Sequence, residues 1–115
     1  MDIKEKVEFI KDLLEDKKGI DVNVLSVEGL TTIADSFVLA TGTSTPHIKS
    51  LADEVEEKMR EKGTQPLRIE GYRTAKWILI DYGDVIVHIF NEESRKFYSL
   101  EWLWADAGKD NGGNK

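Results

Sequence analysis

The segment from Trp77 to Phe90 constrains the fold of this chain more than any other. It contains two short, mainly apolar runs, Lys76–Ile80 and Val85–Phe90, separated by the turn sequence Asp81-Tyr82-Gly83-Asp84. The runs are rich in β-branched and aromatic residues, which suit a pleated strand, and Asp and Gly are favoured in turns. The pattern therefore predicts a β-hairpin.

Alternation along this hairpin separates its side chains into two unlike faces. We take Ile80 and Val85 as the last pair before the turn, which places Trp77 opposite His88. One face is aliphatic and comprises Ile78, Ile80, Val85, Val87 and Ile89. The other, called the mixed face below, comprises Trp77, Leu79, Ile86, His88 and Phe90. Helices typically pack on an aliphatic sheet face, so the mixed face is the candidate functional surface.

Upstream of the hairpin, apolar residues follow first a helical and then a strand spacing. They recur every three or four residues over Asp2–Lys18, which predicts a helix that Gly19 ends. Period-two alternation predicts a strand over Ile20–Val24, and a second strand is expected at about Ser36–Thr41.

A second helix is expected after the turn Gly42-Thr43-Ser44. Thr45 is the expected N-cap and Pro46 the first helical residue, where a missing N–H costs nothing. Gly63 closes this helix, and a strand is expected around Leu67–Ile69. The apolar stripe of the helix comprises Ile48, Leu51, Ala52, Val55 and Met59.

These elements predict a single α/β domain over residues 1–107, because a chain of 115 residues can bury one core. The strand, helix and strand within Ser36–Ile69 form a crossover between parallel strands, whereas the hairpin is antiparallel. We therefore expect a mixed sheet with both helices on one face. The spacing of Tyr98–Trp104 predicts a short helix, in which Trp102 is either an exposed interface residue or part of a structural cap. Residues 108–115, GKDNGGNK, lack apolar side chains and are expected to be disordered.

Composition excludes several classes of function. Without cysteine there is no thiol catalysis, disulfide or thiolate zinc site, and two histidines cannot build a histidine-rich metal site. No apolar run approaches the roughly 20 residues of a membrane helix, and the charged N-terminus does not resemble a signal peptide, so we expect the protein to stay where it is made. A net charge of −6 disfavours nonspecific binding to nucleic acid. Arg68, Arg73 and Lys76 could still touch RNA beside a protein contact, although solvated edge charges are the commoner explanation.

Three patterns with catalytic potential have simpler structural explanations. The Gly42–Ser44 turn could bind phosphate, but a nucleotidyltransferase also needs carboxylates for metal ions, and no acidic residue follows the turn before Asp53. Helix capping alone explains the turn. Asp81 and Asp84 are typical turn residues. His88 has no evident nucleophile partner and is interpreted as an amphipathic contact. The residues alone favour core over interface for the mixed face, because large apolar side chains are usually covered.

Several strings in the sequence resemble the ribosomal silencing factor family, also called the Iojap family. The strings are WILIDYGDVIVHIF at Trp77–Phe90 and YSLEWLWADA at Tyr98–Ala107. Ala34–Ser44 is similar to the family's strand and glycine turn, and His47–Asp53 to the helix after it. Pro46 departs from the pattern at a position where many members carry arginine. The resemblance covers residues 1–107.

The resemblance implies a fold related to nucleotidyltransferases, with a mixed sheet of about five strands. It implies a cytoplasmic, noncatalytic factor without cofactor or metal, which binds protein fourteen of the large ribosomal subunit and obstructs joining of the small subunit. It also favours contact over core for the mixed face. The candidate partner-contacting residues are Lys76, Trp77, Leu79, Asp81, Tyr82, His88, Phe90, Tyr98 and Trp102. Two other interpretations stay open: a small nucleotide-dependent transferase that uses Gly42–Ser44, and a homodimer whose interface is the mixed face.

Overall fold

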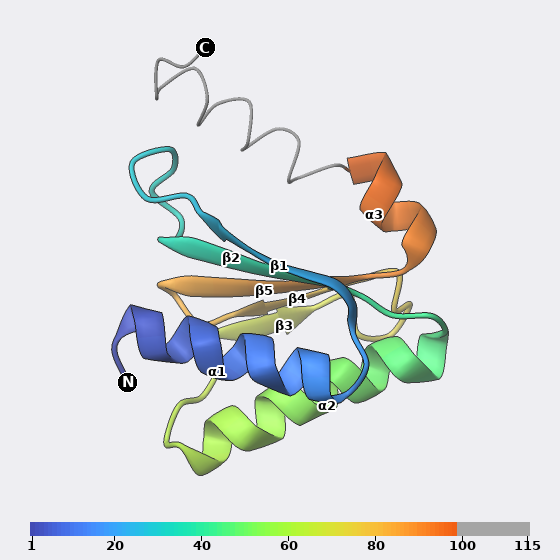
Figure 1. Cartoon of the computed structure of the whole chain (residues 1–115), viewed down its shortest axis with the longest axis horizontal. Helices are drawn as coiled ribbons and strands as arrows, with labels where there is room; N and C mark the ends of the chain where they lie inside the picture. The colour runs from blue at the N-terminus through green and yellow to red at the C-terminus, as the bar shows by residue number, and fades with distance from the viewer. Residues whose placement is uncertain (99–115) are drawn as a thin grey trace.

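Residues 1–98 are described by the structure, a computed structural model, as three helices packed on a five-stranded sheet (Figure 1). The helices are α1 (Ile3–Asp16), α2 (Thr45–Glu61) and α3 (Glu92–Tyr98). The strands are β1 (Ile20–Ser26), β2 (Ser36–Thr41), β3 (Arg68–Glu70), β4 (Trp77–Asp81) and β5 (Val85–Phe90). The predicted Tyr98–Trp104 helix, the position of Trp102 and the predicted disorder of residues 108–115 lie outside the described residues.

The strand order is β1-β2-β5-β4-β3, which confirms the predicted mixed five-stranded sheet. β2 pairs with β5 in parallel, and the other three pairs are antiparallel. The crossover strands β2 and β3 run in the same direction, but β5 and β4 lie between them. β5 lies at the centre of the sheet, and its six residues are buried on both faces. β3 has only three residues, with Arg68 and Glu70 exposed, and this suits a sheet edge.

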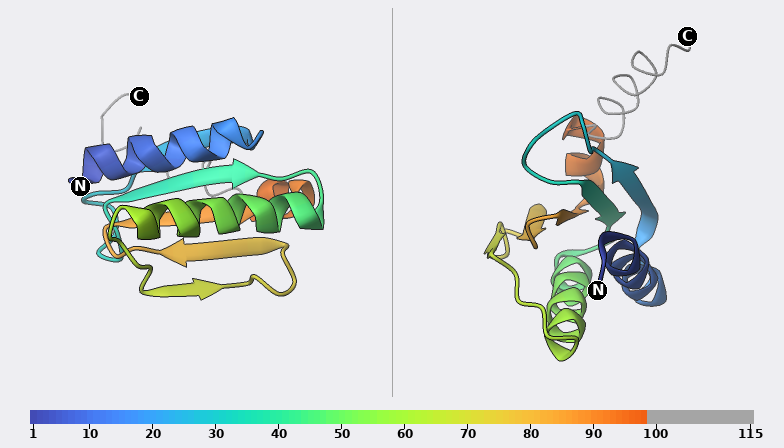
Figure 2. Two further views of the ribbon diagram at one scale, coloured as in Figure 1. Left: turned by 90° about the horizontal axis from the view of Figure 1, so that it is seen from below. Right: turned by 90° about the vertical axis from the view of Figure 1, so that its left-hand side faces the viewer.

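The helices α1 and α2 cover one face of the sheet, and α3 lies on the other side at one end (Figures 1 and 2). All five predicted stripe residues of α2 and all five aliphatic residues of the hairpin belong to the core cluster between these helices and the sheet. The predicted aliphatic face is thus confirmed as the helix-covered face. None of the three described helices is long and apolar enough to span a membrane.

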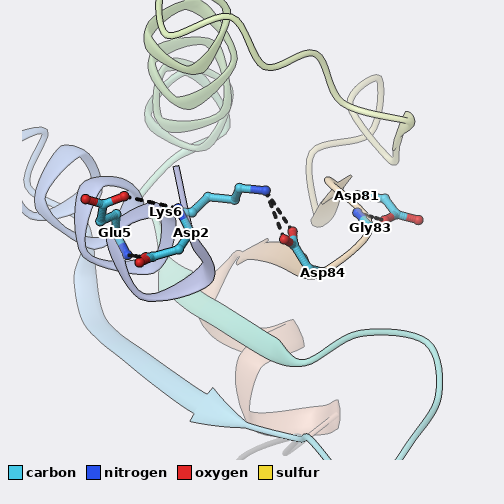
Figure 3. Close-up of polar contacts among 6 residues, drawn as sticks. All are labelled: Asp2, Glu5, Lys6, Asp81, Gly83 and Asp84. Carbon is cyan, nitrogen blue, oxygen red and sulfur yellow. Dashed lines mark hydrogen bonds and ion pairs between the residues drawn. The ribbon is translucent and has the colours of Figure 1, made fainter.

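The helix boundaries differ from prediction by one or two residues. The N-cap of α2 is Ser44 rather than Thr45, because Ser44 is extended and its Oγ accepts the N–H of His47 at 3.2 Å. α1 begins with a capping box between Asp2 and Glu5 (Figure 3). It ends at Asp16, ahead of Gly19. A Cβ on that glycine would lie 2.8 Å from the carbonyl oxygen of Leu14, so close packing explains the glycine.

The register of the hairpin differs from the predicted one by two residues. Asp81 pairs with Ile86 and Trp77 with Phe90, and the N–H of Tyr82 donates to the carbonyl of Val85 at 2.9 Å. The turn therefore has two central residues, of which the first is a glycine at φ +90°. A two-residue hairpin loop with positive φ matches the twist of the strands. A shift of two residues preserves the alternation, so the predicted membership of the two faces is confirmed.

The helix α3 was not predicted. Its signal is local: the side chain of Asn91 accepts the N–H of Ser94 at 2.7 Å, two acidic residues occupy the first turn and two basic residues the last.

Candidate binding surface

The mixed face lies on the side of the sheet opposite α1 and α2 (Figure 1). It forms a second apolar cluster, in which some members are fully buried and others keep exposed surface. The buried members are Val27, Ala34, Phe37, Leu39, Ile86 and Phe90, and the partly buried ones are Leu25, Trp77 and Leu79.

His88 is the polar centre of this cluster and is only 4% exposed. The indole N–H of Trp77 donates to its Nδ1 at 3.0 Å. Because an indole N–H can only donate, Nδ1 must carry a lone pair and the proton of the neutral ring must lie on Nε2. Nε2 is buried and has no hydrogen-bond partner among the described residues. Burial lowers the pKa of His88 to about 4, so the ring is neutral at pH 7.

The neighbours of His88 are aromatic rather than catalytic. Its ring meets that of Phe37 edge-on at a centroid distance of 4.7 Å and stacks on that of Phe90 at 6.1 Å. Trp77 packs against Phe90 at 5.1 Å. This arrangement fixes the indole on the sheet and offers no nucleophile to the imidazole within the part of the chain that is described.

The two turn carboxylates have structural partners. Asp81 accepts the N–H of Gly83 at 2.8 Å and pairs with Arg68 at 3.2 Å. Asp84 accepts two hydrogen bonds from the ammonium of Lys6, at 2.9 and 3.1 Å (Figure 3). The Asp81 contact is the local hydrogen bond expected of a turn residue, whereas the Asp84 side chain joins the turn to α1 through an ion pair that is distant in sequence. No group of three or more His, Asp or Glu side chains in residues 1–98 could hold a metal ion.

The predicted contact residues do not all reach the surface. Lys76 is exposed, and Trp77, Leu79 and Asp81 are partly exposed. Phe90 is only 1% exposed and is buried with His88, because β5 is flanked on both sides by strands. Tyr82 is buried in the opposite, helix-covered cluster, where burial and then the charge of Glu56 raise the pKa of its phenol. A partner cannot reach His88, Phe90 or Tyr82 in this conformation, and the side chains of Tyr98 and Trp102 lie outside the description.

The accessible part of the mixed face is a strip along β4. On one side of it, Arg68 and Glu70 of β3 pair with Asp81 and Leu79 and so point to the same face. Arg68 contacts Glu70 at 3.1 Å. Glu70 and Leu25 of β1 were not predicted as part of the surface, and Arg68 was predicted only as an edge cation that could touch RNA beside it. The alternation Arg68-Ile69-Glu70 around an inward isoleucine is the signal that identifies the charged pair.

The Gly42–Ser44 turn is already occupied by contacts within the chain. The N–H of Gly42 donates to the carbonyl of Phe90, and the N–H of Thr43 donates to Nδ1 of His47, both at 2.9 Å. A Cβ at Gly42 would lie 2.5 Å from Cγ1 of Ile48, so packing of α2 accounts for the glycine. A cavity of about 530 Å³ adjoins this turn at the carboxyl ends of β2 and β5. Of the three backbone N–H groups in the turn that could bind a phosphate, those of Gly42 and Thr43 already donate to acceptors within the protein.

Comparison with known proteins gives a consistent result. Residues 1–114 match the family described as "Ribosomal silencing factor during starvation". The chain is 38% identical to the ribosomal silencing factor RsfS of Halalkalibacterium halodurans, over 93% of this chain and 92% of that protein. A crystal structure of a protein from Chromobacterium violaceum is similar with a TM-score of 0.88 at 36% identity, covering 91% of this chain and 88% of the other. A more distant mouse relative, "Mitochondrial assembly of ribosomal large subunit protein 1", is 27% identical over 85% of this chain and 44% of its own length.

Proposed function

Because the chain belongs to the ribosomal silencing factor family, whose members are ribosome-associated regulators, we propose that it represses translation by binding the large ribosomal subunit. We propose further that it docks on protein fourteen of that subunit and thereby blocks joining of the small subunit in the cytoplasm. The name of the mouse relative, which refers to the large subunit, supports the choice of subunit. The partly exposed strip of Trp77 and Leu79 is the observation that supports docking through the mixed face.

The composition of this strip suits a protein partner. Exposed aromatic and aliphatic side chains with a charged rim are typical of the energetic centre of an interface. A standard interface buries about 800 Å² on each partner, which the strip could supply together with neighbouring segments. The net charge of −6 would steer the protein toward a basic ribosomal protein.

The proposed mechanism is steric and needs no chemical step. The 13.1 kDa protein would occupy the surface where the small subunit docks. A nucleotide-dependent transferase is less well supported, because the Gly42 and Thr43 N–H groups already have acceptors within the protein. Calorimetric titration with magnesium and nucleoside triphosphates tests this alternative, since saturable heat would support the transferase.

Sedimentation with purified large subunits tests the docking surface. We expect Leu79→Lys to weaken binding at least about tenfold, because it places a charge in the proposed apolar contact. Leu67→Lys is the matched control, since Leu67 is 74% exposed but lies outside both apolar clusters. Thermal unfolding of both variants establishes that the fold is intact. If both variants pellet with the subunit like the wild type, the mixed face is not the docking surface.

Trp77→Ala is expected to weaken binding by at least about 2 kcal/mol, as aromatic anchors commonly do. This substitution also removes the donor to His88 Nδ1, so its effect on stability must be measured alongside. If the mixed face is instead the interface of a homodimer, light scattering would report a dimer that Leu79→Lys dissociates.

A sucrose-gradient assay tests obstruction itself. Formation of whole ribosomes from separate subunits should fall in proportion to occupancy of the large subunit, without nucleotide. Ser44→Ala and Asp81→Asn should retain inhibition at saturating concentration. A variant that saturates the large subunit without inhibiting joining would contradict steric blocking and would point to a chemical step.

A further inference from the structure

The connection between β3 and β4, residues 71–76, presents cations and an aromatic ring that the proposed docking strip does not use. Tyr72 is 38% exposed, and Arg73 and Lys76 are exposed. Neither of these two cationic side chains has a hydrogen bond or ion pair within the described residues. Lys49 of α2 adds a third cation, with its Nζ 5.1 Å from the centre of the Tyr72 ring.

This connection is held in a fixed conformation. Gly71 has a φ of +81°, and a Cβ there would collide with the carbonyl oxygen of Trp77. Ala75 is buried, and its N–H donates to the carbonyl of Gly71 at 2.9 Å. The phenol of Tyr72 donates to the carboxylate of Asp53 in α2, at 3.0 and 3.2 Å to its two oxygens. The ring and the backbone that carries the flanking cations are therefore already ordered before any partner binds, which lowers the entropy cost of binding.

The position of the connection links it to the docking strip. Lys76 directly precedes Trp77, the first residue of β4. Figure 2 shows the connection at the same end of the sheet as the start of α2. A ribosomal protein docked on β4 would bring the adjoining part of the large subunit close to these cations.

The chemistry of the connection fits RNA. Ammonium and guanidinium groups bind phosphates, and an exposed aromatic ring can stack on an unpaired base. Arg68 does not contribute in the same way, because Glu70 and Asp81 neutralise it at 3.1 and 3.2 Å. The overall charge of −6 disfavours binding to free RNA, so such a contact requires a docked protein.

We propose that residues 72–76, together with Lys49, form a contact with the phosphate backbone of ribosomal RNA beside the docked ribosomal protein. This proposal rests on the proposed function, since docking on the large subunit supplies the local RNA. It assigns Arg73 and Lys76 to phosphates and Tyr72 to a base.

The salt dependence of binding to purified large subunits tests the proposal. The variant is Arg73→Ala/Lys76→Ala, and the control is Lys4→Ala/Arg60→Ala, which removes two exposed cations from α1 and α2. Loss of two phosphate contacts should reduce the slope of log affinity against log salt by about 1.4 to 1.8. Between 50 and 200 mM salt the wild type should therefore lose about tenfold more affinity than the variant. The control should retain the wild-type slope. Tyr72→Ala should weaken binding without changing the slope, because stacking is not ionic.

Binding to isolated protein fourteen, without RNA, separates this proposal from the proposed function. Here we expect Arg73→Ala, which leaves the candidate protein contact Lys76 in place, to bind as tightly as the wild type. If it loses affinity equally for the isolated protein and the subunit, the connection contacts protein and the proposal is wrong. If Arg73→Ala/Lys76→Ala has the wild-type slope of log affinity against log salt on large subunits, the cations are merely solvated and the proposal is also wrong. If the wild type binds subunits but not protein fourteen, the proposed partner fails while the slope still tests the RNA contact.

Discussion

The ion pair between Lys6 and Asp84 is expected to be the strongest single polar contribution to the packing of α1 on the sheet (Figure 3). It joins residues 78 positions apart, at 2.9 and 3.1 Å. The Lys6 side chain is 11% exposed and that of Asp84 is 31% exposed. At 2.9 Å and an effective dielectric constant of about 20, the Coulomb attraction is about 6 kcal/mol, most of which desolvation of the two ions offsets.

Removing the carboxylate should cost more than removing the ammonium. Asp84→Asn leaves a largely buried ammonium without a counter-charge, and we expect a loss of about 2 kcal/mol in the free energy of unfolding. This corresponds to a fall of about 8 °C in Tm for a domain of this size. Lys6→Met replaces the ammonium with a side chain of similar length and leaves Asp84 partly hydrated, so its cost should be about 1 kcal/mol.

A double-mutant cycle in urea, followed by circular dichroism, measures the coupling. The double variant Lys6→Met/Asp84→Asn should be no less stable than Asp84→Asn alone, because the uncompensated ammonium has gone. Lys58→Met is the control: its partner Glu61 lies 3.9 Å away at the surface, and the change should stay within about 0.5 kcal/mol. Costs of Lys6→Met and Asp84→Asn that add within about 0.5 kcal/mol would refute the argument, since the two side chains would then be energetically independent.

Three further outcomes follow from the structure. The pKa of His88 is about 4 in the folded state, below its ordinary value of 6.5, so the unfolded state binds the proton more readily and stability falls as pH drops from 6.5 toward 4. Urea unfolding at pH 7 and 5 should show about 2 kcal/mol more loss in the wild type than in His88→Gln, which can still accept from Trp77; equal losses would contradict the burial argument. Asn91→Ala should destabilise the start of α3 by about 1 kcal/mol, measured by amide exchange at Ser94, whereas Asn91→Asp should preserve the cap. Gly42→Ala should cost about 1 to 3 kcal/mol in thermal unfolding because its Cβ overlaps Ile48, and an unchanged Tm would mean that α2 shifts freely.

The periodicity of the sequence predicted the sheet face of each hairpin residue better than it predicted which residues pair across the strands. Alternation assigns Trp77 and Ile78 to opposite faces whatever the register, so the two-face division survives a shift of two residues. The register itself depends on the turn, where Gly83 permits a two-residue loop that composition alone does not distinguish from a longer one. The position of β5 between β2 and β4 depends on long-range strand pairing, which local sequence patterns do not predict.

The same limit applies to the candidate site. Aromatic content identified the mixed face, but the division between buried and accessible residues follows from strand order. His88 and Phe90 are buried because β5 is central, and this could not be deduced from the hairpin alone. The cap of α3 at Asn91 was, by contrast, readable from the sequence, since an amide residue followed by two acidic residues is a typical helix start.

Strand order also explains how one hairpin can provide both a core and a contact surface. On the mixed face, His88 of β5 is enclosed between Phe37 and Leu39 of β2 on one side and Trp77 and Leu79 of β4 on the other. β4 has only the short, charged β3 beyond it, so its apolar side chains on the mixed face, Trp77 and Leu79, keep exposed surface. The hydrogen bond from Trp77 to His88 joins the buried mixed-face side chains of β5 to the accessible ones of β4. A partner that binds β4 would therefore meet an indole already held in one orientation, which reduces the side-chain entropy lost on binding. Substitutions of the buried mixed-face residues of β5 should then weaken binding of the partner indirectly, by changing the position of Trp77, rather than by removing a direct contact with the partner.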